Sequence, residues 1–249
     1  MTKHTLLSLS VLIGAGVLAA PYAAATGPVP AGWSCTGGCG TDGADGDVPL
    51  SPLGNPFYEF VTTTGGILGL GQNPVTPPTS PTNGSLLTTP VFSANAGTAL
   101  TFYFDFITSD GGMYADNAWA VLFSAASDMP VAQLYNDTTA ETPYTIGLST
   151  VSWLGEWSGQ CFVDGCGTTG WQSVDYTITG TGNYYLEFGA TNALDELYDT
   201  GLAIDGVALN GIQITSPPPT VPEPGTLALF GAAALALGIV HRRRRKLSI

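Results

Sequence analysis

The sequence lacks basic side chains over almost its whole length. Six of its 249 residues are Lys or Arg, and they lie only at the ends, as Lys3 and the run at 242–246. Both histidines, His4 and His241, belong to the same end segments, so residues 5–240 contain no Lys, Arg or His. Of the 19 Asp and Glu residues, all except Glu223 fall within 26–220, which leaves 18 carboxylates there without a basic partner.

This absence excludes several kinds of chemistry from residues 26–220. Hydrolytic triads use a base with a pKa near neutrality, normally His, to take the proton of the nucleophile. Schiff-base chemistry needs Lys, and clamps on phosphate or carboxylate groups need Arg. Zinc, copper and iron sites built on His are excluded too. Nucleic-acid binding is not expected, because the segment lacks the basic side chains that offset phosphate charge. We therefore expect no nucleic-acid partner, and among catalytic groups only carboxylates remain.

Both ends of the chain are typical of targeting segments. Residues 1–25 are predicted to be a signal peptide, because a weakly basic start and an apolar stretch precede the small residues Ala23 and Ala25. Residues 216–224 form a proline-rich linker that favours extended geometry. An apolar run at 225–240 is predicted to be a short transmembrane helix, and the basic tail at 241–249 is expected to stay cytoplasmic.

The linker ends in a short motif, Val221, Pro222, Glu223 and Pro224, directly before the apolar run and the arginine cluster. This order resembles the PEP-CTERM sorting signal of exopolysaccharide-producing Gram-negative bacteria. The resemblance implies that an exosortase, a membrane protease-transpeptidase, recognises the motif and removes the helix. It also implies an exported precursor anchored in the inner membrane, which then passes to the cell surface or extracellular matrix.

Residues 26–215 are predicted to form an all-β domain. Residues 98–107 alternate, with Leu100, Phe102, Phe104 and Phe106 on one face, which is the pattern of a strand with one buried face. Further segments of this character are separated by Gly, Asn, Asp and Pro clusters: 117–124, 131–135, 171–179, 183–189 and 202–214. Many short strands with turn signals predict a two-sheet sandwich or jelly roll.

The remaining segments of the domain are predicted to have less regular structure. Residues 26–56 and 72–82, rich in Gly and Pro, are expected to be surface loops, and 192–198 to form a short helical turn. The alternation of the last strand shifts parity at Gly206, which predicts a β-bulge. Residues 184–209 resemble the closing strands of PEP-CTERM ectodomains and of carbohydrate-binding-like jelly rolls, which end in an apolar-Asp-x-Val strand, here 204–207. This resemblance implies a jelly-roll ectodomain.

The four cysteines form two local pairs, Cys35 with Cys39 and Cys161 with Cys166. An even number of cysteines in an exported protein favours disulfides, and we predict the two local bridges. A long-range bridge from Cys35 to Cys166 stays open, because spacing does not fix connectivity. A four-thiolate zinc or iron–sulfur site is a further alternative, although these spacings match CxxC metal knuckles poorly.

Clustered carboxylates without neighbouring basic side chains either stay solvated or share a hard cation such as Ca²⁺. The candidates form two sets: Asp42, Asp45 and Asp47 in one Gly-containing loop, and Asp110, Asp116 and Asp205 from separate segments. The first set has a spacing loosely like a calcium turn without the full EF-hand pattern. The second rests on resemblance to jelly rolls in which calcium joins the first and last strands. A structural Ca²⁺ is one expectation, and an acidic solvated surface is the other.

Three functional interpretations follow. We favour a non-catalytic surface or matrix protein associated with exopolysaccharide. One alternative is a carbohydrate-binding module in which aromatic rings stack on pyranose faces, with the candidates Trp153, Trp157, Trp171, Tyr103 and Tyr185. The other is a carboxylate-dependent glycosidase, which needs two acids across a cleft, with the candidates Glu59, Glu141, Glu156 and Glu187.

Overall fold

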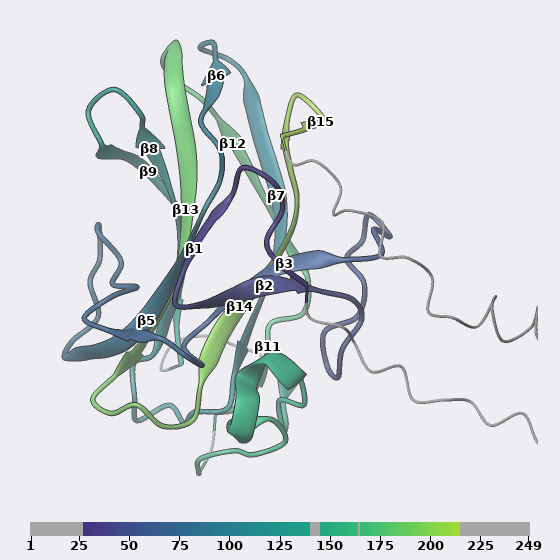
Figure 1. Ribbon diagram of the computed structural model, residues 1–249, viewed down its shortest axis with the longest axis vertical. Helices are drawn as coiled ribbons and strands as arrows, with labels where there is room; N and C mark the ends of the chain where they lie inside the picture. Colours follow the sequence, from purple (N-terminus) through teal and green to yellow (C-terminus); the bar gives the residue numbers. More distant parts are fainter. Residues whose placement is uncertain (1–26, 140–144, 164, 215–249) are drawn as a thin grey trace, which may run out of the picture.

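The computed structural model describes residues 27–139, 145–163 and 165–214. This part of the chain consists of antiparallel strands in two sheets, which lie face to face (Figure 1). The predicted all-β sandwich is therefore confirmed. The predicted signal peptide, proline-rich linker, transmembrane helix and basic tail lie outside the described residues. In the ranges that are described, no helix has the length and apolarity needed to span a membrane.

The first sheet has eight strands and contains the longest alternating segment of the sequence. Its order is β10 (Thr145–Ile146), β11 (Gly167–Thr168), β7 (Ala99–Thr108), β14 (Thr200–Leu209), β3 (Tyr58–Thr62) and β2 (Gly38–Asp42). Two more strands extend it, because β12 (Gln172–Thr177) pairs with β7 and β15 (Ile212–Gln213) pairs with β14. The register between β7 and β14 shifts between Asp205 and Ala208, and Gly206 has a φ of 68°, so the predicted bulge is confirmed.

The second sheet has seven strands. Its order is β1 (Ser34–Thr36), β5 (Pro81–Thr88), β13 (Gly182–Ala193), β8 (Asn117–Ser124) and β9 (Met129–Thr138). The short strands β4 (Ile67–Leu68) and β6 (Phe92–Ala94) pair with β5 and β13. At one edge, β9 pairs with β8 through two register shifts.

The main core lies between the two sheets and is built on the predicted face of β7. Leu100, Phe102, Phe104 and Phe106 are each at most 4% exposed. Phe102 meets Phe188 of β13 edge to face, with ring centroids 5.4 Å apart. Period-2 alternation thus directs one side of each central strand into the shared interior, where burial of apolar surface stabilises the fold.

A second apolar cluster covers the outer face of the eight-stranded sheet. The 3₁₀ segment η1 (Ser152–Trp157) packs Trp153 on Phe60, with stacked rings 5.2 Å apart, and Val48 and Leu154 belong to the same cluster. Because both faces are covered, every residue of β3 is buried. The sequence pattern did not predict η1.

Two local predictions were wrong. Residues 192–198 form the end of β13 and a series of bends instead of a helical turn, since Leu194 and Tyr198 have φ values of 76° and 58°. Such positive values lie outside the right-handed helical region. Residues 26–56 are not all loop either, because they contain β1 and β2. These strands are short and rich in Gly and Cys, so they lack the hydrophobic alternation that would have identified them.

The predicted local disulfides are confirmed as Cys35–Cys39 and Cys161–Cys166. Cys35 belongs to β1 and Cys39 to β2, so the first bridge spans the point where the chain crosses from one sheet to the other. Gly37 makes this crossing at a φ of 93°, and a Cβ there would lie 2.4 Å from Oγ of Ser85. The bridge therefore holds a corner that the backbone can form only with glycine.

Replacing Cys35 and Cys39 together by Ser should lower the melting temperature. A disulfide that closes so short a loop contributes roughly 2 kcal/mol, which for a domain of this size corresponds to about 4–8 °C. Calorimetry measures the shift, and peptide mapping under non-reducing conditions checks that Cys161–Cys166 is still formed. An unchanged melting temperature would contradict a stabilising role for the crossover bridge.

Candidate functional site

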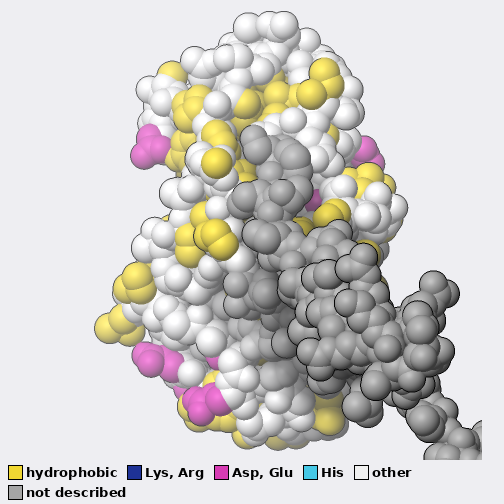
Figure 2. Space-filling view, turned by 45° about the vertical axis from the view of Figure 1, so that its right-hand side comes forward, with side chains coloured by type: hydrophobic (Ala, Val, Ile, Leu, Met, Phe, Trp, Pro, Cys, Tyr) yellow, Lys and Arg dark blue, Asp and Glu magenta, His cyan; other side chains and the backbone are white. Residues whose placement is uncertain are grey.

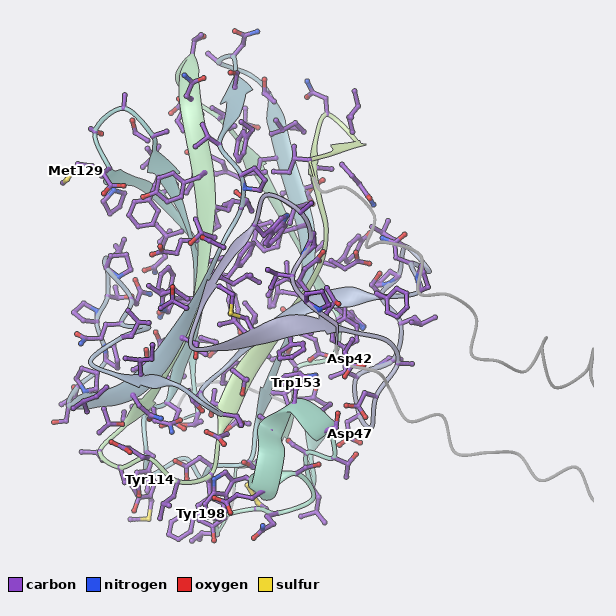
Figure 3. All side chains as sticks on the ribbon, viewed as in Figure 1. Asp42, Asp47, Tyr114, Met129, Trp153 and Tyr198 are labelled. Atoms are coloured by element: carbon purple, nitrogen blue, oxygen red, sulfur yellow. A yellow bond between two sulfur atoms is a disulfide. The ribbon has the colours of Figure 1, made fainter. Side chains whose placement is uncertain are left out.

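Four aromatic side chains from three loops form a row at one end of the sandwich. We call Tyr114, Phe162, Tyr198 and Trp157 the aromatic row. The ring centroids are 5.5 Å apart for Tyr114 and Phe162, 5.1 Å for Phe162 and Tyr198, and 4.4 Å for Tyr198 and Trp157. All four side chains are half-buried, and Figure 3 shows Tyr114 and Tyr198 close together at the lower end of the molecule.

A backbone hydrogen bond and a close backbone approach join the loops that carry Phe162 and Tyr114, and a local disulfide closes the Phe162 loop. The Phe162 N–H donates to the carbonyl of Ser109 at 3.0 Å, and the adjacent bridge Cys161–Cys166 closes the same loop. Gly165 has a φ of 103°, and a Cβ there would lie 2.9 Å from the Gly112 nitrogen. This close approach of two backbones places Phe162 beside the loop that contains Tyr114.

The surroundings of the aromatic row are apolar and acidic. The exposed side chains Met113, Val163 and Leu197 each adjoin a member of the row in sequence and are 75%, 66% and 48% exposed. Glu156 and Glu196 are exposed in the same loops. Half-buried rings with polar groups at the rim are typical of ligand surfaces, because they combine contact area with groups that orient a ligand.

The structure gives the five aromatic candidates from the sequence different positions. Only Trp157 belongs to the aromatic row. Trp153 is a buried residue of η1, and its Nε1 donates to the Tyr58 hydroxyl at 3.2 Å. Trp171 is half-buried and donates to the Pro49 carbonyl at 2.8 Å. The other two lie elsewhere on the sheets, since Tyr185 stacks on Phe123 at 5.0 Å and Tyr103 lines a groove.

Sequence reasoning missed three members of the aromatic row: Tyr114, Phe162 and Tyr198. They lie in Gly- and Asp-rich loops, and the strand pattern directed attention to aromatic residues in alternating segments. The one available signal for Phe162 was its position directly after Cys161, because a local disulfide fixes the loop that presents it.

A surface groove lies on the outer face of the eight-stranded sheet, at the bulge. The groove has a volume of about 270 Å³ and is lined by Tyr103, Ser173, Asp175, Gln213 and Leu53, among others. A Cβ at Gly206 would meet the side chain of Leu53, so the bulge residue lies directly against this loop. The groove is lined by one half-buried ring, Tyr103, and by the buried Phe102, whereas the aromatic row contains four half-buried rings.

The structure separates the second predicted calcium set. Asp110 and Asp116 lie together, each 1% exposed. Asp205 instead accepts hydrogen bonds from Ser51 and Asn55. Asp116 accepts from Thr200, and Asp205 lies five residues further along β14 than Thr200. At the usual rise of a strand, five residues correspond to about 17 Å. Within the described ranges, no three His, Cys, Asp or Glu side chains converge as a metal-binding group.

The first predicted set binds backbone groups at the start of η1. The Asp45 carboxylate accepts from the Ser152 N–H at 2.6 Å, and the Asp47 carboxylate accepts from the Thr150 N–H at 2.8 Å. Asp42 accepts from the Gly43 N–H at 2.7 Å, and its other oxygen is buried without a hydrogen-bond partner. These contacts attach the loop to η1, and calcium binding by this set stays a prediction.

Burial raises the pKa of several carboxyl groups because no basic side chain offsets their charge. Burial raises the pKa of Glu59 to about 8, and the negative charge of Asp205 adds to the rise. Burial also raises the pKa of Asp105 to about 6, although Thr168 and Thr169 donate hydrogen bonds to it. The described surface carries acidic but no basic side chains, as the face in Figure 2 illustrates.

The three described acids considered for glycosidase chemistry lie on different elements. Glu59 is on β3 of one sheet and Glu187 on β13 of the other. Glu156 is exposed on η1. Glu141 lies outside the described residues. The structure therefore brings no two of these three described glutamates together.

Comparison with known proteins supports the sorting prediction. The PEP-CTERM protein-sorting motif matches residues 220–245, which include the Pro-Glu-Pro motif, the apolar run and all four arginines at 242–245. The match makes the chain a precursor that carries an exosortase sorting signal, which implies an exported protein of a Gram-negative bacterium, anchored in the membrane before processing. Among the curated proteins, none matches the chain.

Several solved structures are distantly similar to the chain. The K1 and K2 cleaved adhesin domains of Lys-gingipain are each 15% identical, the former from Porphyromonas gingivalis W83. The K1 match covers 71% of this chain and 92% of that domain at a TM-score of 0.36, and the K2 match covers 74% and 91% at 0.37. A structure described as "CBM4 structure and function" is 13% identical, with 72% and 93% covered and a TM-score of 0.30. With TM-scores below 0.5, these similarities support no inference about function.

The raised pKa of Glu59 predicts that the domain loses stability as the pH rises. The folded state holds a proton on Glu59 between its ordinary pKa of 4.5 and its folded pKa of about 8, so the free energy of unfolding falls through that range. The loss is on the order of 3–5 kcal/mol. Glu59→Gln should flatten the decline of melting temperature between pH 5 and pH 9, because Gln is neutral throughout. Glu156→Gln, on an exposed residue, is the matched control, and equal slopes for both variants would refute the assignment.

Proposed function

We propose that this chain is an exosortase-sorted surface protein whose sandwich domain associates with exopolysaccharide without cleaving it. The sorting signal determines the route, and the aromatic row is the observation that supports a binding role. On this proposal, exosortase removes the C-terminal helix and the domain then remains at the cell surface or in the extracellular matrix. The polysaccharide is the partner that it meets there.

The aromatic row suits a sugar polymer because of its shape and chemistry. Consecutive ring centroids of the row lie 4.4–5.5 Å apart, and aromatic ring faces can pack against the apolar faces of pyranoses. The rim carboxylates of Glu156 and Glu196 are hydrogen-bond acceptors for sugar hydroxyls. Individual stacking contacts of this kind contribute on the order of 1 kcal/mol, so binding would be weak at one domain and strong only with many domains on one polymer.

The positions of the buried acids favour a non-catalytic role. A glycosidase presents two carboxyl groups to the scissile bond. The buried pair Asp110 and Asp116 is 1% exposed at each residue, so a polymer at the surface would not reach it. Glycosidase action is the alternative function. Cleavage of the polysaccharide that is lost on Glu→Gln substitution would establish it.

Replacing Trp157 or Tyr198 by Ala should weaken binding to exopolysaccharide by up to about tenfold, because each change removes a stacking face worth roughly 1.4 kcal/mol at most. Affinity electrophoresis in gels that contain the polymer measures retardation. Tyr103→Ala, which removes a ring from the separate groove, is the matched control and should be retarded like the unsubstituted domain. Equal retardation of all variants, with unchanged melting temperatures, would exclude the aromatic row as the binding surface.

A second experiment tests the sorting step. Replacing Pro222 and Pro224 by Ala should leave the full-length precursor in the membrane fraction, because the motif presented to exosortase is lost. Replacing Pro217 and Pro218 in the same linker is the control, since it keeps a similar loss of rigidity but leaves the motif intact. Immunoblots of membrane and extracellular fractions report the result, and normal release of the first variant would contradict processing at this motif.

A further inference from the structure

Acidic side chains accompany two members of the aromatic row. Glu156 directly precedes Trp157 on η1. Glu196 and Asp195 precede Tyr198 by two and three residues. Glu156 and Glu196 are exposed, and Asp195 is half-buried. Because the rings of Trp157 and Tyr198 are 4.4 Å apart, the acids of both loops belong to the surroundings of one pair of rings.

Electrostatic interactions connect these acids with the loops that carry the row. Burial raises the pKa of Asp199, the residue after Tyr198, and the charge of Glu156 adds to the rise although two threonine hydroxyls donate to Asp199. Burial also raises the pKa of Asp110 to about 7, and the charge of Asp195 adds to that rise. Residues 5–240 contain no Lys, Arg or His, so this end of the sandwich has a negative field that no basic side chain offsets.

The two exposed carboxylates are available to a ligand. Within the described part of the chain, neither Glu156 nor Glu196 uses its carboxylate in a hydrogen bond, whereas Asp195 accepts from the Leu197 N–H at 2.9 Å. A carboxylate attracts cations and accepts hydrogen bonds from them, and the face of an aromatic ring attracts cations as well. Both kinds of group at the row therefore favour a partner with positive charge.

The same charges discriminate among sugar polymers. A polymer of uronic acids would bring carboxylates against Glu156 and Glu196, and like charges at close range oppose association. A neutral polymer leaves both acids without a partner of opposite charge. In a β-linked 2-amino-2-deoxy sugar the protonated amine is equatorial, so it projects sideways when the sugar face stacks on an aromatic ring. Such a unit presents an apolar face to Trp157 or Tyr198 and an ammonium group to the acids at the rim.

We propose that the aromatic row binds a polysaccharide with free amino groups, of the class of partly N-deacetylated hexosamine polymers. The sugar faces pack on Trp157 and Tyr198, and the ammonium groups pair with Glu156 and Glu196. This inference rests on the proposed function, because it names the class of polymer that the same site takes. A polycation also offers many amines to many domains, so one polymer joins copies of a protein that otherwise repel one another.

Isothermal titration of the exported protein with two oligosaccharides of equal length tests the proposal. Glucosamine oligomers from chitosan and N-acetylglucosamine oligomers from chitin share one backbone and differ only in acetylation of the amine. At low salt and about pH 5.5, the sugar amines are protonated and ordinary carboxyl groups are ionised. We expect the amine oligomer to bind roughly tenfold more tightly or better. About 0.5 M NaCl should remove most of this preference by screening, and a uronic acid oligomer should not bind.

The double variant Glu156→Gln with Glu196→Gln should lose the preference for the amine. It should keep the weaker binding of the N-acetylated oligomer, because the rings are intact. Asp128→Asn with Asp175→Asn is the matched control, since it removes the same charge from other exposed positions and should keep the full preference. Asp128 adjoins Met129, which Figure 3 shows far from the labelled tyrosines of the aromatic row.

Equal affinity for the two oligomers, lost in Trp157→Ala, would overturn the amine preference and leave the proposed function standing. A preference that both double variants reduce equally would show diffuse attraction to the whole acidic domain, which also overturns the site. Binding of the uronic acid oligomer would contradict the charge argument directly. Binding of neither glucosamine-type oligomer would overturn this inference, and electrophoresis in gels with the native polymer would then decide the proposed function separately.

Discussion

The absence of every basic side chain between residues 5 and 240 constrains the whole domain. A buried carboxylate in most proteins is paired with Arg, Lys or His, and here it has to be held by hydroxyl and N–H groups. Asp199 accepts from the hydroxyls of Thr63 at 2.6 Å and Thr64 at 2.8 Å. Asp105 is likewise held by two threonines, Thr168 and Thr169. Threonine thus takes over the role that basic residues have elsewhere.

The use of threonine hydroxyls in place of basic side chains determines where polar groups can be placed in the sandwich. A hydroxyl donates one hydrogen and carries no charge, so it stabilises a carboxylate less than a salt bridge does. The interior between the two sheets is apolar, with Phe102 and Phe188 in contact, and the buried carboxyl group of Asp105 belongs to the opposite face of β7 from Phe104 and Phe106. Asp110, Asp116 and Asp199 lie instead in loops that carry the half-buried aromatic row, so these buried acids and the rings share the same backbone segments.

The sequence predicted those features that depend on neighbours along the chain. Alternation identified β7 and β8, a parity shift at Gly206 identified the bulge, and local cysteine spacing identified both disulfides. It failed where distant segments decide the outcome. Asp205 was grouped with Asp110 and Asp116 on resemblance to jelly rolls in which calcium joins the first and last strands, yet hydrogen bonds from Ser51 and Asn55 hold it elsewhere. The aromatic row joins three loops, and no periodicity in one sequence reports which loops meet at the end of a sandwich.

The register shifts of β9 have a consequence for how copies of the domain coexist. An edge strand offers unpaired backbone groups to other chains, and natural sheets often protect such edges with lysine. This domain has no lysine to place there. Two register shifts and Pro130 interrupt the regular pairing of β9 instead, which makes its outer edge a poor template for another strand. Irregular geometry and shared negative charge together oppose the joining of neighbouring sandwiches into a continuous sheet.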